Sequence, residues 1–253
     1  MTIDLNADVG EASTEAARAA ELEVLDAVTS ANIACGAHAG TDETMRATVR
    51  AASARGLAIG AHPGYPDRDG QGRRSMPLDA GAITATVVAQ IRHLATLAGE
   101  TSATLTYVKA HGALYNDAAR DPDIASAIAN AVRLVDRKLR LVGLSGSALI
   151  AAGRAAGLST VDEAFVDRAY RFDGTLVPRT QAGAVLTDPA TVVRRACDLA
   201  LRRPIATADG SSLLVHADTL CLHADTPGAA MLGHEIRRAL TNLGIVVSAT
   251  GAS

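Results

Sequence analysis

Histidine and acidic side chains recur in this sequence where short apolar runs give way to glycine or proline. His38, His62, His111 and His223 all stand in such places, near carboxylates and one lysine. Imidazole and carboxylate groups can transfer protons, and together they suit zinc, manganese or iron as ligands. The sequence contains no HExxH pattern or similar local ligand spacing, so it leaves open whether a metal is bound.

The first apolar run, residues 3–9, carries polar side chains at alternate positions. Asp4, Asn6 and Asp8 therefore share one face of a strand, because successive side chains point to opposite faces. Three polar groups on an inward face are costly to bury unless they are paired. This favours a polar pocket over a solvated edge strand, and Glu11 follows immediately behind it.

Cationic side chains accompany these acids. Lys109 lies on an apolar run, where it could orient a carboxylate or phosphate, act as a desolvated base, or extend its ammonium group to solvent. Arg73, Arg74 and Arg179 lie in loops rich in glycine and proline, where guanidinium groups can clamp anions. The chain has neither a GxxxxGK[ST] motif nor a strand-borne GxGxxG motif, so no self-contained nucleotide loop is indicated.

Composition excludes several classes of protein. A net charge of −3 and an aromatic content of 2% argue against nucleic-acid binding. Cys35, Cys197 and Cys221 form no CxxC pair, which fits a reducing compartment better than a disulfide framework. The N-terminus does not resemble a signal peptide, and no apolar run reaches membrane-spanning length. We therefore expect a cytoplasmic protein that neither binds nucleic acid nor enters a membrane.

Short apolar runs alternate with segments of helical periodicity along the whole chain. Strands are expected at residues 3–9, 31–36, 56–62, 104–111, 139–145, 158–165 and 219–225. Helices are expected at 15–29, from 41 or 42, and at 79–98, 121–137, 147–156, 188–202 and 228–243. Two long loops are expected at 62–77 and 166–183, and loops of this length are commonly functional.

This alternation predicts an α/β protein with a single domain over residues 1–253. Crossovers of this length join parallel strands, so a seven-stranded β/α barrel is the simplest assembly, with an open doubly wound sheet as the alternative. Either fold binds ligands at the carboxyl ends of its strands. We expect the polar side chains near these ends to share one site. They are Asp4, Asn6, Asp8, Glu11, Asn32, His38, His62, Lys109, His111, Asp167, Arg168, Arg179, His223 and Asp225.

Six blocks of this sequence closely resemble the LamB/YcsF family, in order and over nearly the whole chain. They are DLNADVGE (4–11), SANIACGAHAG (30–40), GAHPGYPD with GRR (60–67, 72–74), VKAHGALYN (108–116), DRAYRFDGTLVPR (167–179) and LCLHADTPGA (220–229). The resemblance implies a barrel of the glycoside hydrolase/deacetylase class. It also implies one component of a 5-oxoprolinase, which opens 5-oxo-L-proline to L-glutamate with ATP and partner subunits B and C. Ala110, Gln71, Ala224 and the pair Ala12–Ser13 depart from the family pattern without removing a titratable group.

The chemistry of this reaction suggests roles for the candidate residues. Asp8 or Glu11 would be the base, His62 and His111 would transfer protons or stabilise an oxyanion, and Lys109 would hold phosphate or the substrate carboxylate. The remaining candidates would bind substrate or phosphate, with Asp4 orienting its neighbours; they are Asp4, Asn6, Asn32, His38, Asp167, Arg168, Arg179, His223 and Asp225. ATP, with its divalent cation, would bind at a junction between subunits or at a site without a recognisable motif. A metal-dependent deacetylase or carbohydrate hydrolase, and a non-catalytic regulatory subunit, are the alternatives.

Overall fold

Seven parallel strands pair side by side in the computed structural model, which describes residues 1–224 and 228–251. They are β1 (Thr2–Val9), β2 (Ser30–Ala34), β3 (Ala58–His62), β4 (Tyr107–Lys109), β5 (Arg140–Leu144), β6 (Thr160–Phe165) and β9 (Thr219–His223). Each strand pairs with the next, and β9 pairs with β1. This last pairing closes the sheet into the predicted barrel and excludes the open doubly wound sheet.

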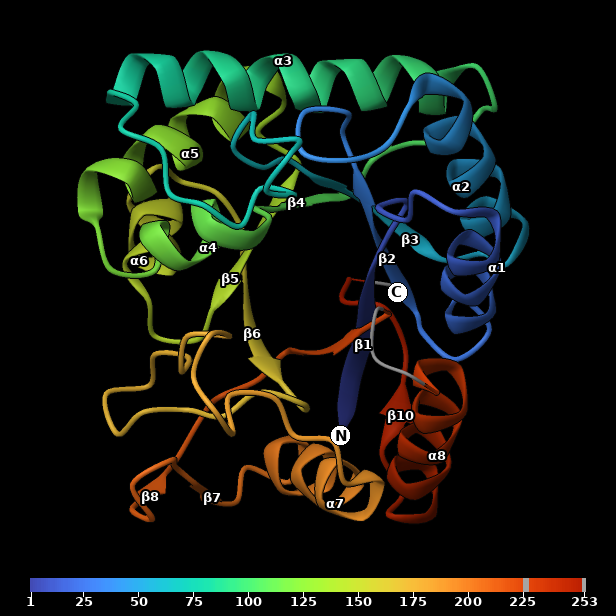
Figure 1. The fold of residues 1–253 in the computed structure, drawn as a ribbon, viewed down its shortest axis with the longest axis vertical. Coiled ribbons are helices and arrows are strands. Elements are labelled where there is room, and N and C mark those ends of the chain that lie inside the picture. Colours follow the sequence, from blue (N-terminus) through green and yellow to red (C-terminus); the bar gives the residue numbers. More distant parts are fainter. Residues whose placement is uncertain (225–227, 252–253) are drawn as a thin grey trace.

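Helices surround the barrel on its outside (Figure 1). Within the described residues they are α1 (Glu15–Val24), α2 (Asp42–Ala54), α3 (Ala80–Gly99), α4 (Gly112–Ala118), α5 (Pro122–Val135), α6 (Ala148–Ala155), α7 (Pro189–Ala200) and α8 (Ala229–Asn242). Thr41 caps α2 as expected, because its hydroxyl accepts a hydrogen bond from the amide of Thr44. None of the described helices combines the length and hydropathy needed to cross a membrane.

Three features differ from the elements expected from the sequence. Helix α4 begins directly after His111, where a loop was expected; its seven residues are too few to produce a clear helical period. The hairpin of β7 (Ile205–Ala206) and β8 (Ser212–Leu213) and the strand β10 (Val246–Val247) are also additional. All three strands have two residues each, which is too short for a detectable alternation.

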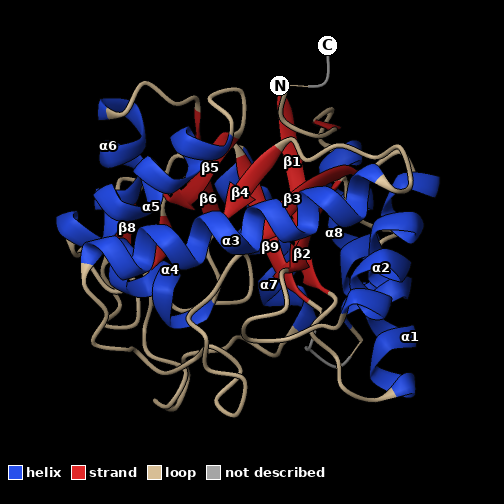
Figure 2. Ribbon diagram, turned by 90° about the horizontal axis from the view of Figure 1, so that it is seen from above, coloured by secondary structure: helices blue, strands red, loops and turns tan. Residues whose placement is uncertain are grey.

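The two faces of β1 show how the sequence divides the molecule. Leu5, Ala7 and Val9 belong to the apolar core, whereas the alternate residues Asp4, Asn6 and Asp8 contact side chains from other strands across the barrel. The barrel interior thus holds these polar groups together with a small apolar cluster of Tyr107, Val142 and Val161, whereas the main apolar core involves the opposite faces of the strands. Loops gather at one end of the barrel (Figure 2).

Gly60 allows an aromatic ring to lie inside the barrel. A methyl group at this position would overlap the ring of Tyr107, whose hydroxyl donates a 2.7 Å hydrogen bond to Asn32 Oδ1. We expect Gly60→Ala to lower the free energy of unfolding by about 1–3 kcal/mol, as overpacking does elsewhere. Urea denaturation measures this loss. Gly99→Ala is the control, since a methyl group there meets no neighbour. An equal loss of unfolding free energy in both variants would contradict the argument that Tyr107 requires a glycine at position 60.

Candidate active site

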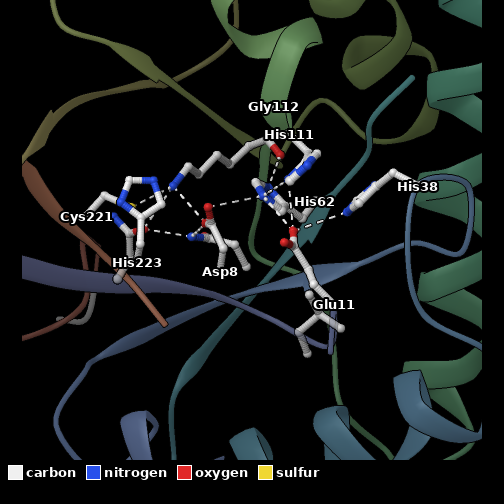
Figure 3. A network of polar contacts seen from close by, with 12 residues as sticks. Asp8, Glu11, His38, His62, His111, Gly112, Cys221 and His223 are labelled. Atoms are coloured by element: carbon white, nitrogen blue, oxygen red, sulfur yellow. Dashed lines mark hydrogen bonds and ion pairs between the residues drawn. The ribbon is translucent and has the colours of Figure 1, made fainter. Parts of the chain in front are cut away.

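A cavity of about 980 Å³ opens at the carboxyl ends of the strands. Its wall includes eight of the candidate residues: Asp8, Glu11, His62, Lys109, His111, Arg168, Arg179 and His223. They come from β1, β3, β4, β9 and the loops that follow β1, β4 and β6. All five residues expected to be catalytic are therefore gathered at one mouth. Figure 3 shows Asp8, Glu11 and the nearby histidines directed toward one another.

Glu11 is the centre of a histidine cluster. Its Oε1 lies 2.8 Å from His111 Nδ1, 3.2 Å from His38 Nε2 and 3.6 Å from His62 Nε2. The rings of His38 and His111 stack with centroids 3.9 Å apart. His38 is 1% exposed and does not line the cavity, so it supports Glu11 from behind rather than meeting a substrate.

The charges in this cluster are mutually stabilised. Burial alone would raise the pKa of Glu11, but the contact with His111 holds it well below its usual range. Burial opposes the charged form of His111, yet the neighbouring Glu11 raises its pKa above the usual value. Burial lowers the pKa of His38 to about 4, so this ring is neutral near pH 7. The cluster thus presents an ionised carboxylate next to a proton-carrying imidazole.

Asp8 is fixed by donors from inside the barrel. Its Oδ1 accepts from Lys109 Nζ at 2.9 Å and from Asn32 Nδ2 at 2.7 Å, while its Oδ2 lies 3.4 Å from His62 Nε2. The pKa of Asp8, which burial alone would raise, is held well below its usual range by His62 and Lys109. Asp8 therefore remains ionised with one oxygen directed toward the histidines.

The ammonium group of Lys109 is directed into the barrel. It lies 2.8 Å from Glu163 Oε1 and 3.1 Å from Cys221 Sγ in addition to its contact with Asp8, and its side chain is 2% exposed. The expectation that Lys109 holds phosphate or the substrate carboxylate stays a prediction, and these contacts show a further task. The partly buried Asp8 and the fully buried Glu163 neutralise its charge, so Lys109 positions Asp8.

Three expected ligand-binding residues are held inside the barrel and do not line the cavity. Asp4 accepts hydrogen bonds from Ser30, Thr29 and Thr219. Asn6 and Asn32 are linked by a 2.7 Å hydrogen bond, and none of the three candidates contacts the cavity. Depth along the strand explains this for Asp4, because two residues advance about 6.6 Å and Asp4 lies roughly 13 Å from Asp8. Asn32 is instead the register partner of Asp8 and donates to its Oδ1 at 2.7 Å.

The opposite wall of the cavity carries His223 and the loop after β6. His223 Nδ1 lies 2.8 Å from both carboxylate oxygens of the buried Asp167. Arg168 donates to the carbonyl oxygens of Val177 and Ala184 at 2.6 and 3.3 Å, so much of its guanidinium shapes this loop. Arg179 lines the cavity from the same loop. Asp225, also a candidate, lies outside the described residues.

Acidic residues that the sequence reasoning missed support the cluster. Glu163 lies on an expected strand, and its place on the same strand face as Val161 and Phe165 was the available signal. Glu21 accepts hydrogen bonds from the backbone amides of Gly10 and Glu11 at 2.8 and 3.2 Å. It lies on α1, and its sequence position gives no indication of this contact.

The short GQG segment at 70–72 also reaches the site. His111 Nε2 lies 2.9 Å from the carbonyl oxygen of Gln71. Gly72 has a φ of +65°, and a side chain there would collide with His111 and His38. The loop therefore needs this glycine to approach the imidazoles.

The His223–Asp167 pair predicts a pH-dependent contribution to stability. Burial alone would raise the pKa of Asp167, but the charge and hydrogen bonds of His223 lower it below the usual value. A carboxyl group whose pKa is lower in the folded chain than in the unfolded chain stabilises the fold at pH values above its unfolded pKa of about 3.9. This stabilisation is lost as the pH falls through the lower pKa of the folded chain.

We expect Asp167→Asn to lower the free energy of unfolding by about 1–3 kcal/mol at pH 7, because a charged hydrogen-bonded pair is lost. The difference from the native chain should shrink below about pH 4. Chemical denaturation at a series of pH values measures it. Asp69→Asn, at an exposed loop position, is the control. If the loss of unfolding free energy in Asp167→Asn were unchanged at low pH, the stabilising role of the His223–Asp167 pair would be contradicted.

Residues that could hold a metal ion fall into three overlapping sets in the described part of the chain. They are Asp8–His62–His111, Glu11–His38–His111 and Asp8–Cys221–His223, and in each the ligand atoms lie within 4.8 Å of one another. The first two share His111 and meet beside Glu11. The third includes Cys221, whose thiol pKa is raised well above its usual value by burial, which disfavours the thiolate that binds metals.

Comparisons with known proteins extend over nearly the whole chain. The family model described as LamB/YcsF family matches residues 3–253. The protein named as the A subunit of 5-oxoprolinase in Heliobacterium modesticaldum is 46% identical over 249 residues, covering 98% of both chains. A protein of the same name from Methylococcus capsulatus is 47% identical, covering 99% of this chain and 96% of the relative.

Solved structures also share the fold. The crystal structure of a lactam utilization protein from Thermus thermophilus has a TM-score of 0.90 and 42% identity, covering 98% of this chain and 100% of that one. A GH113 β-1,4-mannanase has a TM-score of 0.52 at 12% identity, covering 96% of this chain and 98% of that one, and confirms only the expected barrel class. The ordered sequence blocks, the closed barrel and the full-length matches establish that the chain belongs to the LamB/YcsF family.

Proposed function

We propose that this chain is the A subunit of a 5-oxoprolinase and that its barrel mouth is where the lactam ring of 5-oxo-L-proline is opened to give L-glutamate. The observation that carries the proposal is the pair of ionised carboxylates, Asp8 and Glu11, held beside His62 and His111 at a cavity. Full-length relatives named as the A subunit of 5-oxoprolinase support this choice of substrate.

The chemistry needed is hydrolysis of an unreactive amide. Transfer of the γ-phosphoryl group of ATP to the lactam oxygen would release ADP and make the ring carbon more electrophilic. One water molecule then adds to that carbon, the carbon–nitrogen bond breaks, and the nitrogen takes up a proton. The resulting glutamyl phosphate is hydrolysed by a second water molecule to L-glutamate and phosphate. The protein must orient water, stabilise negative charge and supply the proton.

The geometry distributes these tasks within the cluster. Glu11 has the more exposed carboxylate, with its side chain 21% exposed against 15% for Asp8, so we assign it to the attacking water. Asp8 cannot rotate away, because Lys109 and Asn32 hold one of its oxygens, and it fixes His62. His111 lines the cavity beside Glu11, and we assign it the supply of a proton to the ring nitrogen.

The opposite wall is suited to the anionic parts of the substrate. Arg179 and His223 both line the cavity, facing it from the β6 loop and the end of β9. A guanidinium can bind a carboxylate or phosphate through two parallel hydrogen bonds. We therefore assign the substrate carboxylate or the transferred phosphate to this wall.

ATP, its accompanying divalent cation and partner subunits B and C complete the proposal. The chain has no recognisable nucleotide loop, so we assign phosphorylation to a junction with the partners or to the partners themselves. This division of labour makes the isolated chain inactive toward the lactam, whereas the assembled complex turns it over.

Reconstitution with each component omitted in turn tests the proposed function. The purified chain is mixed with partners B and C, ATP and 5-oxo-L-proline, and glutamate is measured over time. We expect glutamate only when all three proteins are present. Glutamate formation at the full rate without this chain would reject its role in ring opening.

A further inference from the structure

Backbone carbonyl groups fix the tautomers of two histidines beside the cavity. His62 Nδ1 lies 2.8 Å from the carbonyl oxygen of Lys109, and His111 Nε2 lies 2.9 Å from that of Gln71. A carbonyl oxygen only accepts hydrogen bonds, so these two ring nitrogens carry the hydrogens. In the neutral rings, the lone pairs are then on His62 Nε2 and His111 Nδ1.

These lone pairs converge with two carboxylates. His62 Nε2 and His111 Nδ1 are 3.0 Å apart. Asp8 Oδ2 lies 3.4 Å from the former, and Glu11 Oε1 lies 2.8 Å from the latter. A proton placed between any two of these acceptor atoms leaves the other two acceptor atoms in unfavourable contact. A divalent cation instead attracts all four acceptor atoms.

The spacing of the four atoms fits the coordination shell of a transition metal. Such an ion binds imidazole nitrogen and carboxylate oxygen at about 2.0–2.2 Å, which keeps neighbouring ligand atoms about 2.8–3.5 Å apart. The separations of 2.8, 3.0 and 3.4 Å fall within this range, and the 3.6 Å between Glu11 Oε1 and His62 Nε2 lies at its upper edge. Two imidazoles with two carboxylates favour zinc, iron or manganese over Mg²⁺, which prefers oxygen ligands and water.

Contacts behind these atoms hold them in place. Each imidazole donates its second N–H to a backbone carbonyl, which is the common support for a metal-bound histidine. Lys109 and Asn32 both donate to Asp8 Oδ1, at 2.9 and 2.7 Å, so that Oδ2 is left for the centre. The site is thus supported from the barrel interior and from the loop that carries Gln71.

We infer that Asp8, Glu11, His62 and His111 form a binding site for one divalent first-row transition-metal ion at the barrel mouth. All four residues line the cavity, so the ion would also be accessible to water or to a substrate oxygen. There it would act as a Lewis acid. The site shares its four residues with the proposed lactam chemistry but rests on ligand geometry alone, so metal binding and lactam hydrolysis are tested by separate measurements.

Titration of the metal-free, untagged, full-length chain with Co²⁺ tests the inference through its visible absorption and through metal analysis after gel filtration. We expect one bound Co²⁺ per chain. His62→Ala and Glu11→Gln should each weaken binding by more than about 100-fold, since loss of even an outer-shell contact costs about 10–100-fold. His216→Ala is the matched control, because His216 is exposed and contacts Asp218 at 3.1 Å, and it should bind as the native chain does.

Glu11→Gln keeps the size of the side chain, so it remains informative if the histidine variant fails to fold. Weakened binding in this variant, with an unchanged circular dichroism spectrum, supports the site. A native chain that binds no Co²⁺, or equal binding in native chain and both ligand variants, would overturn it. If the chain binds Co²⁺ but the complex does not hydrolyse the lactam, the metal site is supported and the proposed function is rejected. If the complex hydrolyses the lactam but this chain binds no Co²⁺, the proposed function is supported and the metal site is rejected.

Discussion

Replacement of Asp8 by asparagine is expected to lower the rate of 5-oxo-L-proline hydrolysis by the assembled complex about 10²–10⁴-fold, the usual contribution of a positioned acid–base group. Asparagine has the same shape and can still accept the hydrogen bond from Lys109. It removes the negative charge that lies 3.4 Å from His62 Nε2. Steady-state glutamate formation with saturating ATP and partners measures the change.

Asp69→Asn is the control for this variant. It also replaces an aspartate by asparagine, but at an exposed position outside the cavity wall, and should leave the rate unchanged. Gel filtration of the reconstituted complex shows whether Asp8→Asn still assembles. A fully assembled complex with a normal rate would reject the catalytic assignment of Asp8.

Replacement of Lys109 by methionine is expected to cause the largest loss of stability among these variants. The ammonium group neutralises Asp8 and Glu163 at 2.9 and 2.8 Å, and Glu163 is fully buried. Methionine fills much of the same volume but leaves both acids without their cation. Breaking a buried ion pair in this way typically costs about 3–5 kcal/mol in the free energy of unfolding, measurable by urea denaturation.

The sequence contains two lysines, which provides a matched comparison. Lys138 is exposed beyond the end of α5, so Lys138→Met should change the free energy of unfolding by less than about 0.5 kcal/mol. Restored stability in a Lys109→Met, Glu163→Gln double variant would support the charge argument. Equal stability of the two single lysine variants would contradict it.

The sequence predicted the barrel and the gathering of its polar side chains because both follow from local pattern. Alternation along residues 3–9 placed Asp4, Asn6 and Asp8 on one face, and the strand–helix order placed the strand ends at a common mouth. The structure confirms the closed barrel and brings Asp8, Glu11 and His62 together.

The depth of each side chain within the barrel and the identity of its ion-pair partners could not be predicted in the same way. Asp4 and Asp8 share a face, but only the register of neighbouring strands shows that Asp4 lies near Ser30 and Thr219, below the cavity. The ion pair of Lys109 with Glu163 joins residues far apart in the chain, and the sequence offers many other acids. Contacts of this kind depend on tertiary packing, which periodicity does not specify.

The position of the lactam in the assembled complex shows whether the ring is opened at this barrel mouth. A structure of the three-protein complex with 5-oxo-L-proline should place the lactam carbonyl carbon within reach of a water molecule held by Glu11. The substrate carboxylate should then face Arg179 or His223. A lactam bound entirely within one of the partners, far from the barrel mouth of this chain, would contradict the account.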